Sequence, residues 1–217
     1  MKVLREYINE IIPILTDAHK KTPPEPRTQK LNELLTISNF KEVEPYLVTD
    51  ILPIVLKRTD DKPIVSEVAL KVGKLFIKNV SVQAFPKIIQ ILFNEMREES
   101  KWKAKVGSLT LLGDYIQRLE VYDRELLSAC LPELVEAISG LLYDTKPEVA
   151  DLAEIVLRKA MNGITNKDLE PFTEDLSGVA EFLDNIDFLK VKTKYTKGKD
   201  WTAVSLYGYG SNPSDIL

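Results

Sequence analysis

The residues best suited to bind a partner surround a tryptophan near the middle of the chain. Trp102 is flanked by Lys101, Lys103 and Lys105, at a turn between two apolar helical patterns. Hot spots in protein interfaces favour tryptophan with basic neighbours. In the alternative interpretation, the indole ring packs on the preceding helix while the lysine side chains are solvated. We treat these four residues as candidate contacts to a protein partner.

A second concentration of lysines lies near the end of the sequence, beside aromatic residues. The candidate binding residues in this segment are Lys192, Lys194, Lys197, Lys199 and Trp201. Lysines next to aromatic rings can follow a phosphate backbone while the rings stack on bases. The same lysines also suit an exposed strand edge that resists aggregation, the interpretation we favour. Nucleic-acid binding is therefore expected only through a local basic patch.

The sequence offers little for catalysis or metal binding. Cys130 and His19 are the only cysteine and the only histidine, so neither a thiolate cluster nor an intrachain disulfide can form. The sequence contains no GxxxxGK[ST] motif for ATP hydrolysis. We therefore predict a protein that is not an enzyme and that holds no cofactor and no metal. A single cysteine favours a reducing compartment, so we expect a cytoplasmic location.

Overall charge and hydropathy exclude two further classes of partner. The formal net charge of −4 argues against nucleic-acid binding through overall electrostatics, although a local basic patch is compatible with it. No apolar run approaches the roughly 18 to 20 residues that cross a bilayer, so we expect no membrane association.

Apolar residues at helical spacing, interrupted by turns, predict the elements that position these candidates. Four prolines near the start of a helix recur at intervals of 33, 46 and 39 residues: Pro53, Pro86, Pro132 and Pro171. The turns in 60–70 and 143–153 share Asp, Lys-Pro and Val at similar offsets, which adds Lys146 as a candidate contact. A period near 40 is typical of two-helix repeats, which must stack to bury a core. The pattern predicts an all-α, HEAT-like α-solenoid of antiparallel helix pairs.

The composition changes beyond the predicted repeats. Residues 188–195 and 201–209 alternate apolar and polar side chains across a turn, which is typical of a β-hairpin. We therefore predict a helical repeat domain over 1–185 and a short β-hairpin-like appendage over 186–217.

Three segments carry a family resemblance. They are KWKAKVGSLTLLGD, LPELVEAISGLLYDTKPEV and NKDLEPF. Together they resemble the N-terminal HEAT-repeat domain of translation elongation factor 3, and the related region of the large scaffold protein that activates a stress kinase on stalled ribosomes. The resemblance implies a non-catalytic interaction scaffold that binds the ribosome or a translation factor.

Two alternatives stay open. A tryptophan at an inter-helix turn followed by basic residues is similar to tubulin-binding arrays of the TOG type, although those usually carry it in their first repeat. The ending KGKDWTAVSLYGYGSNPSDIL resembles the opening strands of iron and 2-oxoglutarate dependent hydroxylases. Their facial triad needs two histidines and a carboxylate. This alternative therefore makes the chain the helical N-terminal module of a larger enzyme.

Overall fold

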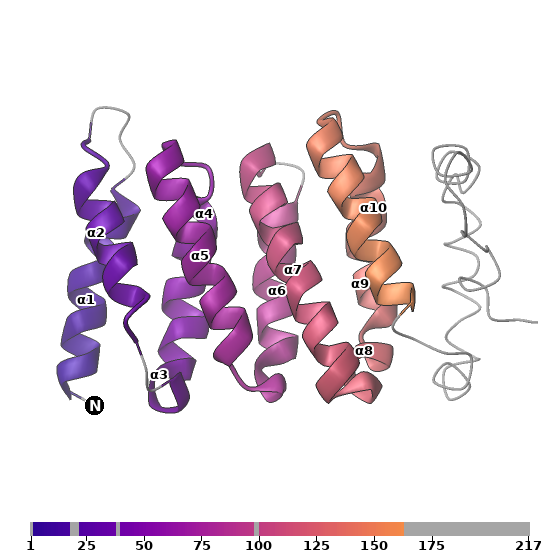
Figure 1. Cartoon of the computed structure of the whole chain (residues 1–217), viewed down its shortest axis with the longest axis horizontal. Coiled ribbons are helices and arrows are strands. Elements are labelled where there is room, and N and C mark those ends of the chain that lie inside the picture. Colours follow the sequence, from indigo (N-terminus) through magenta and orange to yellow (C-terminus); the bar gives the residue numbers. More distant parts are fainter. Residues whose placement is uncertain (1, 18–21, 38–39, 98–99, 163–217) are drawn as a thin grey trace, which may run out of the picture. The chain divides into compact units, whose positions relative to one another are not determined.

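The computed structural model describes residues 2–17, 22–37, 40–97 and 100–162, and every regular element in these ranges is a helix. The elements are α1 (Lys2–Thr16), α2 (Glu25–Leu34), α3 (Phe40–Tyr46), a π-helical turn (Leu47–Ile51), α4 (Leu52–Arg58), α5 (Pro63–Asn79), a 3₁₀ turn (Val82–Ala84), α6 (Phe85–Met96), α7 (Trp102–Tyr122), α8 (Arg124–Ala129), α9 (Leu131–Ser139), a 3₁₀ turn (Gly140–Tyr143) and α10 (Pro147–Asn162) (Figure 1). The predicted all-α, HEAT-like fold class is confirmed. The predicted appendage over 186–217 lies outside the described residues.

The chain divides into two compact units, Met1–Tyr115 and Ile116–Leu217. In the first unit α1 packs on α2 and α4, α2 and α4 pack on α5, and α4 packs on α6. The N-terminal part of α7 belongs to this unit, where the ring of Tyr115 meets the ring of Phe85 on α6 at 5.1 Å between centroids. In the second unit α9 packs on α8 and α10. Antiparallel helix pairs are the building blocks of both units (Figure 1).

The second helices of the pairs repeat one buried pattern. On α5 the residues buried at this spacing are Val65, Ala69, Val72 and Phe76, and on α10 they are Val149, Ala153, Val156 and Ala160. The two sets are offset by 84 residues, about two repeats, and each member is at most 1% exposed. The corresponding residues on α7 are Ala104, Ser108, Leu111 and Tyr115, all buried. The predicted repeat therefore sets which face of each helix enters the core.

The prolines mark the starts of the first helices, as predicted. Pro86 and Pro132 each occupy the first turn of their helix, where no helical partner is needed for the missing N–H. Pro53 is the second residue of α4 but lies inside the continuous helical run 40–58. The π-helical turn Leu47–Ile51 directly precedes α4, and it joins α3 to α4 without an intervening loop. A locally widened turn relieves the clash that the ring of Pro53 would otherwise make with the preceding turn. Pro171 lies outside the described residues.

Candidate partner-binding groove

A groove of about 300 Å³ lies in the first unit, between the N-terminal halves of α5 and α7. Its apolar lining comes from Pro63 and Leu70 on α5 and from Trp102 and Val106 on α7. Polar groups at the groove come from Thr59, Asp61, Ser66, Glu67, Lys103 and Thr110. This volume is at the lower end of those seen for ligand sites, so the groove suits one or two side chains of a partner better than a large cofactor.

Trp102 begins α7 and is partly buried beside the groove. The ammonium of the exposed Lys103 lies over its indole ring, 5.7 Å from the ring centroid. A cation over the face of tryptophan is attracted by the ring quadrupole. The indole thus packs partly against protein and partly lines the open groove, and its contact with a partner stays a prediction.

A glycine brings α7 close to the end of α4. A Cβ atom on Gly107 would lie 2.7 Å from Thr59 Oγ1 and 2.9 Å from Thr59 Cβ, closer than such atoms approach in real structures. The hydroxyl of Thr59 donates a hydrogen bond to the carbonyl of Leu56 at 2.6 Å and lies 3.5 Å from the carbonyl of Lys103. Glycine at this position therefore permits the close helix packing beneath the groove.

An ion-pair cluster fixes the turn at one end of the groove. Asp61 forms ion pairs with Arg27 at 2.9 Å and with Arg58 at 3.1 Å, and the side chains of Arg27 and Asp61 are only 2% and 9% exposed. Burial alone would raise the pKa of the Asp61 carboxyl. The hydrogen bond from the Lys62 amide and the two guanidinium charges outweigh that effect and hold its pKa below the ordinary value. The carboxyl is therefore ionised and fully engaged at neutral pH.

Two further contacts join the inter-helix turns of the first unit. The ammonium of Lys101 lies 2.6 Å from Asp60 Oδ2, and the ammonium of Lys62 donates to the carbonyl of Thr22 at 3.3 Å. The Lys62–Thr22 contact and the Arg27–Asp61 pair connect α2 and the turn before it to the turn before α5. The Lys101–Asp60 pair connects the turn before α5 to the turn before α7. The turns thus present a continuous polar edge beside the groove.

The predicted contact residues differ in position and exposure. Trp102 and Lys103 lie together at the groove. The side chain of Lys101 is 76% exposed and pairs with Asp60. Lys105, also predicted as a candidate contact, is only 7% exposed and therefore lies below the accessible surface. The reason is helical phase: α7 begins at Trp102, and the third residue after it falls on the side that carries the buried Ser108.

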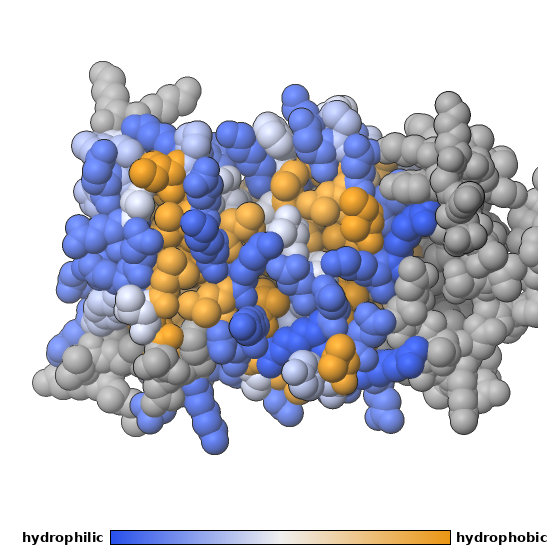
Figure 2. All heavy atoms as spheres, viewed as in Figure 1, coloured by the Kyte–Doolittle hydropathy of each residue, from blue (hydrophilic) through white to orange (hydrophobic). Residues whose placement is uncertain are grey.

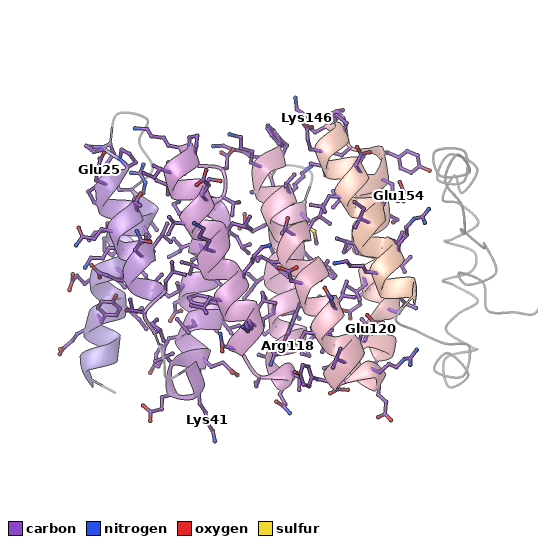
Figure 3. All side chains as sticks on the ribbon, viewed as in Figure 1. Glu25, Lys41, Arg118, Glu120, Lys146 and Glu154 are labelled. Atoms are coloured by element: carbon purple, nitrogen blue, oxygen red, sulfur yellow. The ribbon has the colours of Figure 1, made fainter. Side chains whose placement is uncertain are left out.

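The remaining predicted contacts lie elsewhere. Lys146 is exposed at the N-terminal end of α10 in the second unit (Figure 3), and its amide donates to Asp144 Oδ1 at 2.9 Å. In the first unit the Lys62 amide likewise donates to an aspartate of its turn, Asp61, which directly precedes it. The members of the C-terminal set, Lys192, Lys194, Lys197, Lys199 and Trp201, lie outside the described residues.

Sequence reasoning missed the contribution of α5 to the groove. Glu67 is exposed, Ser66 and Leu70 are partly buried, and all three line the groove opposite α7. The apolar pattern of α5 reveals its buried face, and these residues flank that face. What the sequence lacks is any sign that this flank lies next to Trp102.

The described residues provide little for nucleophilic or metal chemistry. Burial and the neighbouring charge of Glu133 raise the pKa of the Cys130 thiol to about 11, so very little thiolate is present at neutral pH. Within the described ranges, no three His, Cys, Asp or Glu side chains come together as a metal site would require. In those ranges, too, every helix is too short or too polar to span a bilayer.

Comparisons with known proteins agree with the fold. The family described as EF3 N-terminal HEAT repeat matches residues 8–157. Elongation factor 3 of Gonapodya prolifera is 28% identical over 163 residues, covering 73% of this chain and 14% of that protein. The elongation factor 3 proteins of Eremothecium gossypii and Mycosarcoma maydis are 30% and 27% identical over 135 and 132 residues, covering 62% and 60% of this chain and 12% of each relative. The chain thus spans about one eighth of the length of these relatives.

Proposed function

Since the chain belongs to the family of EF3 N-terminal HEAT repeat domains, we propose that it is a non-catalytic interaction module that binds the ribosome or a translation factor in the cytoplasm. The observation that carries this proposal is the groove beside Trp102, a concave surface with an aromatic anchor in a chain of that family. Translation elongation is named for the relatives, which are much longer than this chain. Its extension to this chain is our inference.

The groove favours a protein contact. Apolar side chains of Leu70, Trp102 and Val106 would surround an apolar side chain of the partner, while Lys103 at the rim would meet a carboxylate. Interface hot spots combine an aromatic anchor with a well-packed pocket, and their truncation typically costs about 2 kcal/mol or more. That figure corresponds to a loss of about 30-fold in affinity.

Co-sedimentation with purified ribosomes at moderate salt tests this function. The wild-type chain should pellet with ribosomes, and Trp102→Ala should weaken the association by about 30-fold. Tyr122→Ala is the matched control, because Tyr122 is an aromatic residue that is 73% exposed and does not line the groove. Failure of the wild-type chain to pellet, or equal binding by wild type and Trp102→Ala, would count decisively against the proposal.

Tubulin binding of the TOG type is the second candidate function, because Trp102 does lie at an inter-helix turn. Two features weaken it: this turn belongs to the third helix pair of the chain, and Lys105 is buried. Gel filtration with tubulin separates the two candidates. A tubulin complex that is lost in Trp102→Ala would favour the TOG-like function over ribosome binding.

A further inference from the structure

Most polar side chains that line the groove between α5 and α7 are already bonded within the protein. The hydroxyl of Ser66 donates to the carbonyl of Thr59 at 2.7 Å, and the hydroxyl of Thr110 donates to the carbonyl of Val106 at 2.8 Å. The hydroxyl of Thr59 donates to the last turn of α4, and Asp61 pairs with two arginines. These groups therefore have little left to offer a partner.

Two charged side chains at the groove remain available. The carboxylate of Glu67 is exposed on α5. Among the residues that the structure describes, it forms no hydrogen bond or ion pair, even with Lys71 one turn further along the helix. The ammonium of Lys103 lies over the indole of Trp102 and has no carboxylate partner within the same described ranges. Opposite charges thus lie on the two helices that form the groove.

Apolar side chains line the groove alongside these two charges. On α5, Pro63, Glu67 and Leu70 lie at spacings of four and three residues, so they share one face of the helix. Seven residues of helix correspond to about 10.5 Å, which makes the groove about two helical turns long. Figure 2 shows apolar side chains beside the hydrophilic side chains of α5 on the visible face. A groove of this length suits one apolar side chain of a partner with a charged neighbour on either side.

The two opposite charges distinguish protein from nucleic acid as the occupant of the groove. Every nucleotide carries a negative phosphate, so a strand in the groove would be repelled by Glu67. A protein segment can present charges of both signs beside an apolar side chain. We propose that the groove binds a protein segment in which an arginine contacts Glu67 and a carboxylate contacts Lys103. This recognition rests on the proposed function, because it takes place in the same groove, and it adds the chemistry of the partner.

Arginine suits the α5 side of the groove better than lysine does. The planar guanidinium can donate two parallel hydrogen bonds to one carboxylate, whereas an ammonium acts as a point charge. Protein interfaces are also enriched in arginine and depleted in lysine. With an arginine at Glu67 and a carboxylate at Lys103, neither charge of the groove is covered by the partner without an opposite charge beside it.

Co-sedimentation of charge variants of Glu67 with purified ribosomes tests this recognition. Glu67→Gln removes the carboxylate and should weaken binding about two- to five-fold, as expected for one partly exposed ion pair. Glu67→Lys brings like charges together and should weaken binding at least about tenfold. If a phosphate faced position 67, Glu67→Lys would instead strengthen binding. The sign of the change in affinity therefore decides between protein and nucleic acid.

Glu120→Lys is the matched control, because it changes the net charge by the same amount. Glu120 is exposed near the C-terminal end of α7 (Figure 3) and does not line the groove, so this variant should bind like wild type. Circular dichroism should be unchanged for both lysine variants, since both glutamates are exposed.

Two results would overturn this recognition and leave the proposed function standing, provided that Trp102→Ala still weakens binding. They are tighter binding by Glu67→Lys than by wild type, and equal binding by Glu67→Lys and Glu120→Lys. Failure of the wild-type chain to pellet with ribosomes would overturn both the proposed function and the recognition that rests on it.

Discussion

Gly107→Ala tests the close approach of α7 to the end of α4, on which the groove depends. The new methyl group would lie 2.7, 2.8 and 2.9 Å from Oγ1, Cγ2 and Cβ of Thr59, which is itself only 5% exposed. Neither the new Cβ of residue 107 nor the Cβ of Thr59 can move by side-chain rotation, so the backbone of α7 must move away from the end of α4. Overpacking of this kind costs about 1 to 3 kcal/mol, and alanine recovers up to about 1 kcal/mol in a helix interior. We expect a net destabilisation of about 1 to 2 kcal/mol.

Glycine-to-alanine substitution at two other positions provides comparisons for this change in stability. A Cβ on Gly73 would meet only the side chain of Leu111, with Cδ1 at 2.6 Å, and the end of a leucine side chain can rotate away. Gly73→Ala should therefore change stability by less than about 1 kcal/mol. Nothing lies within 4 Å of a Cβ on Gly140, whose φ of −59° any residue adopts. Gly140→Ala should stabilise the protein by about 0.4 to 1 kcal/mol.

Thermal unfolding followed by circular dichroism measures the three variants under one condition. For a chain of this size each kcal/mol shifts Tm by about 2 to 4 °C, so Gly107→Ala should melt about 2 to 8 °C below wild type. The Tm should be lowest for Gly107→Ala, intermediate for Gly73→Ala and highest for Gly140→Ala. If Gly107→Ala melts at or above Gly140→Ala, the packing of α7 against Thr59 described above is incorrect.

Three further substitutions or reactions test other parts of the structure. The depressed pKa of Asp61 stabilises the fold above pH 4, roughly the ordinary pKa of an aspartate, and this stability is lost as the pH falls through the lower folded value. Asp61→Asn should therefore flatten the acid limb of a plot of unfolding free energy against pH. At pH 7 it should lower the free energy of unfolding by about 3 kcal/mol, because the buried charge of Arg27 loses its partner. An unchanged acid limb would refute the pairing. Cys130, whose pKa of about 11 lies two units above the ordinary 9.0, should react with iodoacetamide at pH 8 about 100-fold more slowly than an ordinary thiol, and equal rates would contradict its burial. Tyr115→Phe removes a 3.0 Å hydrogen bond to the carbonyl of Ser81 and should lower the free energy of unfolding in urea by about 1 kcal/mol, and an unchanged free energy would contradict this contact.

The repeat architecture was predictable because it depends on the spacing of prolines and apolar residues close together in the sequence. The apolar residues of α5 are buried at the helical spacing that the sequence shows. The matching Lys-Pro turns place Pro63 and Pro147 at the first positions of α5 and α10. These features depend on residues within one or two turns of one another, where proline geometry and apolar periodicity act directly.

Contacts between repeats were not predictable in the same way. Arg27 is buried next to Asp61, and the two residues are 34 positions apart in a sequence that carries no signal of their pairing. The burial of Lys105 depends on the residue at which α7 begins, and a shift of the helix start by one residue changes the side on which it falls.

Site-specific photocrosslinking on purified ribosomes is the most direct test of the proposed partner-binding groove. Benzoylphenylalanine replaces Lys103 at the groove in one variant and Lys87, an exposed lysine of α6 away from the groove, in the other. If the groove holds a component of the translation machinery, Lys103→benzoylphenylalanine yields one discrete protein adduct, which Trp102→Ala in the same chain abolishes. Equal adducts from both positions, or none from position 103 on ribosomes that retain the chain, would contradict the proposed role of the groove.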